Sequence, residues 1–380
     1  MKTPLHVTVY LPLFPRDLWG PPNRGDAVLP FSAPRAWYYF LARNAIYHGV
    51  DLLGLRPGDE VLMPAYHHGI EVETLVAKGL GLRFYGVDEA MDVNPDEVRS
   101  ALRPATRALY AIHYLGFPSP IAALRDIAKG AGIPLIEDCA LALYSNSPDG
   151  PCGSFGDIGV FNLYKSLPTP HGGMLVANRE DLPAPPPTVE PGSLSTGAYV
   201  VNRLLDGLMM SGWPGGPAAA EAARAIARRL KHGVRAETLP IDTGDLDLGV
   251  IDFGVRQVTR DIVRRAGPER IRRIRRENYS RMLERLRDGC RVVRPELPDG
   301  VCPLSFPIFV RDKEAVYERL LAEGVESVNM WSRRRPQVPE GAFPATEFLR
   351  KHCLELPIHQ GVKPGHVDFI AERALRHARW

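Results

Sequence analysis

The chain has 380 residues, of which 45% are hydrophobic and 24% are charged, and its formal net charge is +3. This composition excludes a disordered or fibrous protein, and the length suffices for one large domain and one smaller domain. The small net charge predicts no nucleic-acid partner. No run of about 18 apolar residues predicts insertion into a membrane.

The cysteines and the N-terminus point to the cellular compartment. Five cysteines occur without a CxxC pair, which argues for a reducing compartment and against a disulfide framework or a zinc site. The N-terminus lacks the basic region and long apolar core of a signal peptide. We therefore expect a cytoplasmic protein without a bound metal.

The first half of the chain alternates between two patterns. After an irregular, proline-rich arm of about 30 residues, short apolar runs alternate with longer helical segments. We expect strands at 36–41, 60–64, 82–87 and 107–112, and helices at 42–53, 70–78, 95–103 and 121–131. Such alternation with short links predicts an α/β fold whose mostly parallel sheet is covered on both faces.

The most informative stretch runs from residue 133 to residue 177. Three apolar runs predict buried strands at 133–136, 158–163 and 174–177, and a glycine-rich segment separates the first from the second. Asp138 follows the first run and Lys165 follows the second. Because ligands of an open parallel sheet bind beyond the carboxyl ends of its strands, we expect both side chains to face one crevice.

An aspartate and a lysine in one crevice suit the chemistry of pyridoxal 5'-phosphate (PLP). A lysine can hold the aldehyde of this cofactor as a Schiff base, and a buried aspartate can keep its pyridine nitrogen protonated. The alternative is a structural salt bridge beside a surface lysine. The two residues alone do not decide between these interpretations.

The spaced elements around Asp138 and Lys165 resemble the signature of the DegT/StrS-like sugar aminotransferases, a PLP-dependent family of the aspartate aminotransferase superfamily. The matching elements are Glu137-Asp138, Gly153-Ser154-Phe155-Gly156-Asp157, Phe161 to Lys165, and Gly172-Gly173-Met174. The resemblance implies the PLP-dependent transferase fold type I, with a mostly parallel sheet in a large domain and a smaller α+β C-terminal domain. It covers most of the chain from about residue 40.

The resemblance also assigns residues to the cofactor. His68, four residues after Pro64, takes the place of an aromatic side chain that stacks on the pyridine ring. Arg43 and Asn44 take the place of a phosphate cradle at a helix start, where free backbone N–H groups favour an anion. His113 opens a turn that resembles the family's turn beside the cofactor. The alternatives are a loop histidine without a ligand, an ordinary capped helix and a structural histidine.

Two positions depart from the family pattern and mark a divergent member. Leu141 stands where many members have Gln or His, and Val160 stands where many have a serine on the phosphate. We therefore expect other groups to hold the phosphate, namely Ser154, Asn162, Arg43 or backbone amides. The retained Lys165 argues against a related dehydratase branch, in which a histidine replaces this lysine.

The sequence pattern is weakest at the start of the second half of the chain. Residues 182–246 hold a proline-rich linker and two helical segments. A long arginine-rich helical pattern at 259–286 is interrupted by Gly267-Pro268 and is either a solvated connecting helix or a surface that recruits an anionic substrate. The strands and helices expected after it resemble the family's small domain. We place a large PLP-binding domain at 1–246 and a small domain at 247–380.

The resemblance implies a homodimeric aminotransferase. Lys165 and Asp138 are the expected catalytic residues, an amino acid such as L-glutamate is the expected donor, and a nucleotide-linked keto sugar is the expected acceptor. Two alternatives remain open at this point. One is a PLP enzyme that acts on a non-sugar substrate, and the other is a catalytically lapsed member that serves as a binding protein.

Overall fold

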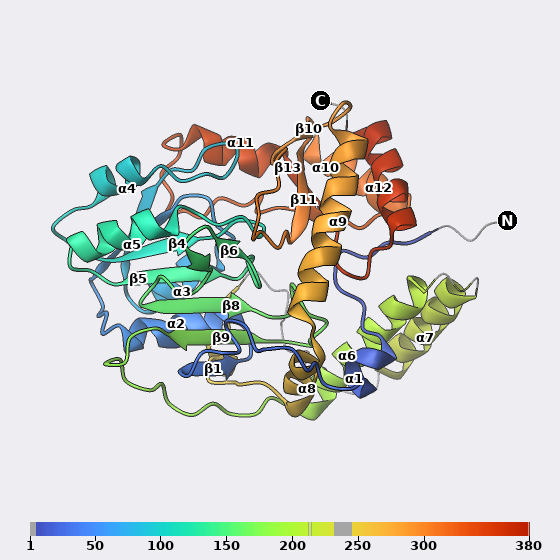
Figure 1. Ribbon diagram of the computed structural model, residues 1–380, viewed down its shortest axis with the longest axis horizontal. Coiled ribbons are helices and arrows are strands. Elements are labelled where there is room, and N and C mark those ends of the chain that lie inside the picture. The colour runs from blue at the N-terminus through green and yellow to red at the C-terminus, as the bar shows by residue number, and fades with distance from the viewer. Residues whose placement is uncertain (1–4, 212, 214, 232–244, 379) are drawn as a thin grey trace.

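A computed structural model describes residues 5–211, 213, 215–231, 245–378 and 380 (Figure 1). A seven-stranded sheet occupies the N-terminal half of the chain, and a four-stranded sheet belongs to the C-terminal part. A two-stranded ribbon of β6 (Asn146–Ser147) and β7 (Gly150–Pro151) lies in the loop after the fifth strand. None of the described helices is long and apolar enough to cross a membrane.

The large sheet has the predicted, mostly parallel arrangement. Its strands are β1 (Ala36–Tyr39), β2 (Glu60–Pro64), β3 (Gly81–Tyr85), β4 (Thr106–Ile112), β5 (Leu135–Cys139), β8 (Ile158–Asn162) and β9 (Gly173–Ala177). They follow the order β1-β9-β8-β5-β4-β2-β3, and only β9 runs antiparallel to its neighbours. The carboxyl ends of β2, β4, β5 and β8 therefore meet at one edge of the sheet.

Helices cover both faces of this sheet (Figure 1). On one face α2 (Ala42–Leu52) packs against α3 (Ile70–Ala77), and on the other α4 (Pro95–Ala101) packs against α5 (Ile121–Gly130). The helix α5 buries Ile121, Leu124 and Ile127, whose spacing places them on one side of the helix. The helix α4 begins where the side chain of Asn94 accepts a hydrogen bond from Asp96 N–H. These helices leave the strand ends free to form a site.

The C-terminal part forms a separate antiparallel sheet. Its strands are β10 (Arg291–Val292), β11 (Ser305–Phe309), β12 (Val328–Asn329) and β13 (Cys353–Pro357), in the order β10-β11-β13-β12. Around it lie α9 (Pro268–Leu286), α10 (Lys313–Ala322), α11 (Pro344–His352) and α12 (Pro364–His377). The long orange helix in Figure 1 is α9, and it starts at Pro268, where the sequence predicts a break after α8 (Gln257–Arg265).

The remaining elements connect these two units. They are α1 (Pro15–Trp19), the helical hairpin of α6 (Ser193–Met209) and α7 (Gly216–Lys231), and a 3-10 turn, η1 (Leu248–Val250). The N-terminal arm lies on the C-terminal part, because Val7 pairs with Val325 as a short parallel bridge. Residues 232–244 lie outside the described residues, so the domain boundary placed at 246 stays a prediction.

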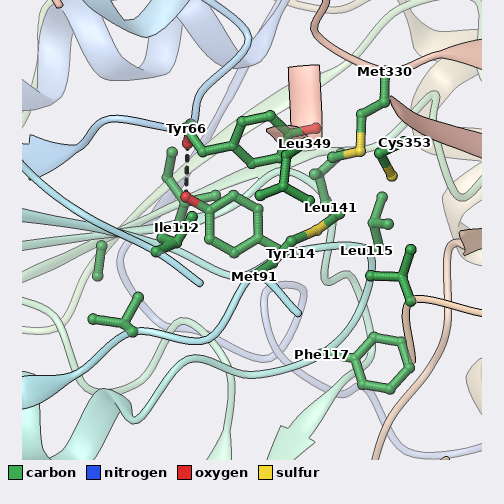
Figure 2. Packing of buried hydrophobic residues seen from close by; sticks show 14 of the residues in the cluster. Tyr66, Met91, Ile112, Tyr114, Leu115, Phe117, Leu141, Met330, Leu349 and Cys353 are labelled. Carbon is green, nitrogen blue, oxygen red and sulfur yellow. Dashed lines mark hydrogen bonds between the residues drawn. The ribbon is translucent and has the colours of Figure 1, made fainter. Parts of the chain in front are cut away.

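One apolar core joins the two sheets. Figure 2 shows Tyr66, Tyr114 and Leu141 from the loops of the large sheet beside Met330 and Leu349 from the C-terminal part, and all five belong to one buried cluster. The hydroxyl of Tyr114 donates a hydrogen bond of 2.7 Å to the carbonyl oxygen of Tyr66. Leu141, one of the two departures from the family pattern, therefore packs in the seam between the sheets.

A glycine sets the distance between the large sheet and the start of α2. A Cβ atom on Gly173 would lie 2.3 Å from the carbonyl oxygen of Leu41, the residue before α2. No side chain fits in that space, and the obstruction is backbone that cannot rotate away. Gly173 therefore allows the start of α2 to lie directly against the sheet.

We expect Gly173→Ala to lower the free energy of unfolding by more than about 3 kcal/mol, because the added methyl group must push α2 off the sheet. The control is Gly130→Ala, where nothing lies within 4 Å of the added Cβ and the change should stay within about 1 kcal/mol. Urea unfolding measures both. Equal stability of Gly173→Ala and wild type would contradict this packing.

Candidate active site

A cavity of about 390 Å³ opens at the carboxyl ends of the parallel strands, where the large sheet faces the small one. Its polar and aromatic lining includes residues from both units: Arg43, His68, Glu71, Asp138, Asn162, Tyr164, Lys165, Ser305, Asn329, Trp331, Arg333, Arg335, Glu355 and His359. The sequence predicts that Asp138 and Lys165 face one crevice, and the structure brings both side chains to this cavity. Of the other predicted site residues, Arg43, His68 and Asn162 also line it.

Asp138 lies near the end of β5 and is almost fully buried. Its carboxylate accepts a hydrogen bond of 2.7 Å from the Tyr110 hydroxyl and one of 2.8 Å from Ala140 N–H. Burial, followed by repulsion from Glu71, raises the pKa of Asp138 to about 6, and the positive charge of Lys165 opposes this shift. Asp138 is thus a fixed, desolvated carboxylate that would gain from a cationic partner.

Lys165 lies in the turn that follows β8 and is half-buried. Its backbone N–H donates to the side-chain oxygen of Asn162 at 3.3 Å, which ties the turn to the end of the strand. Within the part of the chain that the structure describes, the Nζ atom of Lys165 has no hydrogen bond or ion pair. The amine is therefore held at the cavity by its backbone and is available for a reaction.

His68 forms part of the cavity wall with Trp331. The two rings meet edge to face, with their centroids 6.4 Å apart. The residue after His68, Gly69, caps the start of α3 with a φ of +110°. His68 lines the cavity and His67 does not. Burial lowers the pKa of His67 to about 3, and its ring stacks on Phe84.

Only one of the two predicted cradle residues reaches the cavity. Arg43, in the first turn of α2, lines the cavity and donates a hydrogen bond of 2.7 Å to the carbonyl oxygen of Asp245. Asn44 lies outside the cavity lining, contrary to the prediction. Its side-chain amide donates to the carbonyl oxygens of Val250 and Ile251, because the helix turns it toward that segment.

Ser154 and His113 also lie outside the cavity. Both belong to segments that are arranged around the buried carboxylate of Glu137. The glycine-rich segment wraps its backbone around this buried carboxylate, which accepts hydrogen bonds from the N–H groups of Gly153, Phe155 and Gly156. In that conformation Ser154 faces solvent and donates only to the carbonyl oxygen of Pro151. The glycine-rich segment therefore binds a carboxylate of this chain and not an external phosphate.

His113 supports the same carboxylate from the neighbouring strand. Its Nε2 atom lies 2.9 Å from a Glu137 oxygen, and its Nδ1 atom accepts a hydrogen bond from Ser119 N–H. Donor atoms of His113, Glu137 and Cys139 lie within 4.8 Å of one another, close enough to be tested as a metal site. Because Nδ1 is the acceptor, Nε2 carries the proton and donates it to Glu137, so this imidazole has no free lone pair for a metal.

Several cavity residues were not predicted from the sequence. Glu71, in the first turn of α3, and Glu355, in β13, are buried carboxylates, and burial raises the pKa of each. Glu355 accepts a hydrogen bond of 2.6 Å from the Ser305 hydroxyl. An acid inside the otherwise apolar strand 353–357 is a signal that could have identified Glu355. Glu71 resembles an ordinary acidic residue at a helix start and carries no such signal.

The donor set of the cavity fits PLP. A buried carboxylate and an unengaged amine line the same cavity, an imidazole and an indole form a wall for a flat ring, and Arg43 supplies a cation at the start of a helix. Val160 does not line the cavity. It is the register partner of Asp138 in the β5–β8 pair and is fully buried within the sheet. The phosphate would therefore be held by other groups, and Arg43 is the one cation among those expected from the sequence.

Comparison with known protein families and curated proteins agrees with this geometry. The sequence model of the DegT/DnrJ/EryC1/StrS aminotransferase family matches residues 42–184. The dTDP-4-dehydro-2,3,6-trideoxy-D-glucose 4-aminotransferase of Saccharopolyspora spinosa is 26% identical over 356 residues, or 88% of this chain and 82% of that protein. GDP-perosamine synthase of Vibrio cholerae is 32% identical over 139 residues, or 36% of this chain and 38% of that protein.

Solved structures show the same fold. The aminotransferase TlmJ from Streptoalloteichus hindustanus is 24% identical with a TM-score of 0.62, over 90% of this chain and 85% of that one. An E. coli GDP-4-keto-6-deoxy-D-mannose-3-dehydratase with bound hydrated PLP is 17% identical with a TM-score of 0.64, over 90% of this chain and 88% of that one. These similarities confirm the fold class expected from the sequence.

The raised pKa of Asp138 predicts that its charge destabilises the cofactor-free protein. The wild-type protein loses stability as the pH rises from about 3, where the carboxyl is largely protonated in both the folded and the unfolded chain, to about 6. We expect Asp138→Asn to unfold with a free energy higher by on the order of 3 kcal/mol above pH 6, because an amide still satisfies Tyr110 and Ala140.

The gain should vanish below about pH 3, where the carboxyl is protonated in both states. Urea unfolding of both proteins across this pH range measures the difference. A variant that is equally or less stable than wild type above pH 6 would show that Asp138 is not held in a strained, desolvated state.

Glu137→Gln tests the anchor of the glycine-rich segment. The amide group of glutamine would face N–H donors that now meet a carboxylate oxygen, so we expect a loss of about 3 kcal/mol or more in the free energy of unfolding. Ser154→Ala is the matched control in the same segment and should change stability by less than about 0.5 kcal/mol. Similar losses in the two variants would rule out the special role of Glu137.

Proposed function

We propose that the chain is a member of the DegT/DnrJ/EryC1/StrS aminotransferase family, whose sequence model matches residues 42–184, and that it transfers an amino group from an amino acid to a keto sugar carried on a nucleotide. The single observation that carries the proposal is the position of Asp138 and Lys165 on one cavity at the ends of adjacent strands. The cofactor of this reaction is pyridoxal 5'-phosphate.

The residues of the cavity have different roles in such a reaction. PLP, when bound, supplies an aldehyde that receives the amino group and a ring that withdraws electrons from the reacting carbon. Lys165 would hold the aldehyde through Nζ, and its amine is the group on this chain that could carry a proton to and from the reacting carbon. Asp138 would keep a proton on the pyridine nitrogen, and the attraction to that cation would offset the free energy of burying the Asp138 charge.

The walls of the cavity orient the cofactor and the substrate. His68 would stack on one face of the ring, and Arg43 would pair with the phosphate at the start of α2. Asn162 holds the turn that carries Lys165, through its hydrogen bond to the backbone N–H of that residue. Glu137 and His113 do not line the cavity. They hold the glycine-rich segment against β5 through hydrogen bonds to the Glu137 carboxylate.

The relatives support the proposed acceptor, and Lys165 supports amino transfer as the reaction. The Saccharopolyspora relative is a dTDP-sugar aminotransferase and the Vibrio relative is a GDP-perosamine synthase, which favours a nucleotide-linked keto sugar. Glutamate is the proposed donor. The fold is shared with a dehydratase, and the lysine at position 165 favours amino transfer over dehydration.

We extend the proposal to assembly and location. A homodimer follows from the family expectation that two subunits complete each site. A cytoplasmic location is supported by the five cysteines, all of which are buried free thiols. An enzyme that acts on a non-sugar ketone is the alternative that an acceptor screen addresses directly.

Lys165→Ala tests the proposal in the donor half of the reaction. With PLP bound, the wild-type protein should convert glutamate to 2-oxoglutarate in a single turnover, without any acceptor. We expect the variant to be slower by at least about a thousandfold, because it lacks the amine that moves the proton. Lys78→Ala is the control, since Lys78 forms a surface ion pair with Asp51 and should leave the rate unchanged.

A rate for Lys165→Ala near that of wild type would refute the assignment of the catalytic amine. Absence of 2-oxoglutarate with the wild-type protein at saturating PLP would favour a lapsed member that acts as a binding protein. A wild-type protein that turns over glutamate but aminates simple ketones, and no nucleotide-linked keto sugar, would place the acceptor in another class.

A further inference from the structure

Three consecutive arginines lie in the loop between β12 and α11, and their surroundings differ. Arg334 donates hydrogen bonds to the carbonyl oxygen of Val338 and to the carboxylate of Glu340, at 2.7 and 3.0 Å. Arg335 forms an ion pair with Glu73 of α3. Among the described residues, no hydrogen bond or ion pair involves the side chain of Arg333, which lines the rim of the cavity and is exposed.

A buried guanidinium fixes the backbone of this loop. Arg350, in α11, donates hydrogen bonds of 2.8 Å to the carbonyl oxygen of Trp331 and 3.0 Å to that of Arg333. From the same group it donates at 2.9 Å to the carbonyl oxygen of Ala65, in the loop that carries His68. Arg350 therefore ties the two walls of the cavity together, and Arg333 projects from a backbone that is already ordered.

The loop holds an uncommon conformation that this clamp maintains. Trp331 has a φ of +42°, which is unfavourable for any residue other than glycine. Its indole packs on Tyr66 and Tyr114, with ring centroids 5.0 and 5.9 Å away. Packing on one side and the Arg350 hydrogen bond on the other keep the strained residue in place, which is typical of a site held ready for a ligand.

The charges inside the cavity exclude a second anion from its depth. Glu71, Asp138 and Glu355 are buried carboxylates on the cavity wall. Of the cations there, the proposed function assigns Lys165 and Arg43 to the cofactor. A substrate with two further negative charges would meet repulsion inside the cavity, whereas at the rim it would meet the guanidinium of Arg333.

We propose that Arg333 is the subsite for the diphosphate of the sugar nucleotide, at the rim of the cavity and outside the reacting centre. This inference rests on the proposed function and names the group that recognises its substrate class. A guanidinium matches two phosphate oxygens at once, so it selects acceptors that carry a diphosphate over free keto sugars. The sugar then extends inward along Trp331 toward Lys165.

Calorimetric titration of the PLP-loaded protein with UDP, dTDP and GDP tests this assignment. We expect the wild-type protein to bind at least one of them, and Arg333→Gln to weaken that binding by about 10-fold to 100-fold. Arg333→Lys should fall between them, because it keeps the charge and loses the planar fork. Arg334→Gln makes the same change in charge one residue away, and should change the affinity by less than about threefold.

Three results would overturn the assignment. They are no binding of any nucleoside diphosphate by the wild-type protein, equal weakening in Arg333→Gln and Arg334→Gln, or unchanged binding in Arg333→Gln. Equal weakening would mean that only the net positive charge of the loop matters. In Arg333→Gln, the fold-loss of nucleotide affinity must also exceed the fold-rise in the glutamate concentration that gives half-maximal rate. A larger effect on glutamate would mean that Arg333 binds the carboxylate of the donor.

The titration and the single-turnover assay with glutamate together separate this inference from the proposed function. Nucleotide binding that depends on Arg333, in a protein that never converts glutamate, would support the subsite and refute amino transfer. Conversion of glutamate without nucleotide binding would support amino transfer and refute the subsite.

Discussion

Adjacent residues of a β-strand point to opposite faces of the sheet, and near the end of β5 this rule separates two buried carboxylates. Glu137 faces the glycine-rich segment and binds its backbone N–H groups, whereas Asp138 faces the cavity. The first carboxylate is satisfied within the chain, and the second is desolvated beside another acid. The site depends on this division, because the same two residues support the loop and expose an acid to the cofactor.

The energetics of the cavity follow from that arrangement. Burial raises the pKa values of Glu71, Asp138 and Glu355, so the cofactor-free protein buries acids that would be more stable in water. Four cationic side chains also line the cavity, namely Arg43, Lys165, Arg333 and Arg335, of which Arg335 is already paired with Glu73. A further positive charge beside Asp138 would relieve its repulsion with Glu71. Such a cavity is less stable empty than filled, which is how binding energy can be used to hold a charged cofactor ring in place.

The sequence predicts the large sheet well because local patterns determine it. Short apolar runs and helical segments alternate in order, and Gly267-Pro268 marks a real break between α8 and α9. The convergence of Asp138 and Lys165 also follows from the topology of a parallel sheet. The role of Ser154 does not, because the glycine-rich segment suits any anion and the sequence does not show that Glu137 already occupies it. Trp331, which lines the cavity, and Arg350, which fixes its loop, were missed because both take up these positions only after the small sheet packs on the large one.

The identity of the reactive amine is the most direct test of this account. The protein is mixed with PLP, reduced with borohydride and digested, and the labelled lysine is identified by mass spectrometry. The account predicts the label on Lys165. Lys313 is the informative alternative, because burial lowers its pKa to about 8, but its Nζ atom already donates to the carbonyl oxygens of Met330 and Arg350 outside the cavity. A label on Lys313, or no label at saturating PLP, would contradict the account.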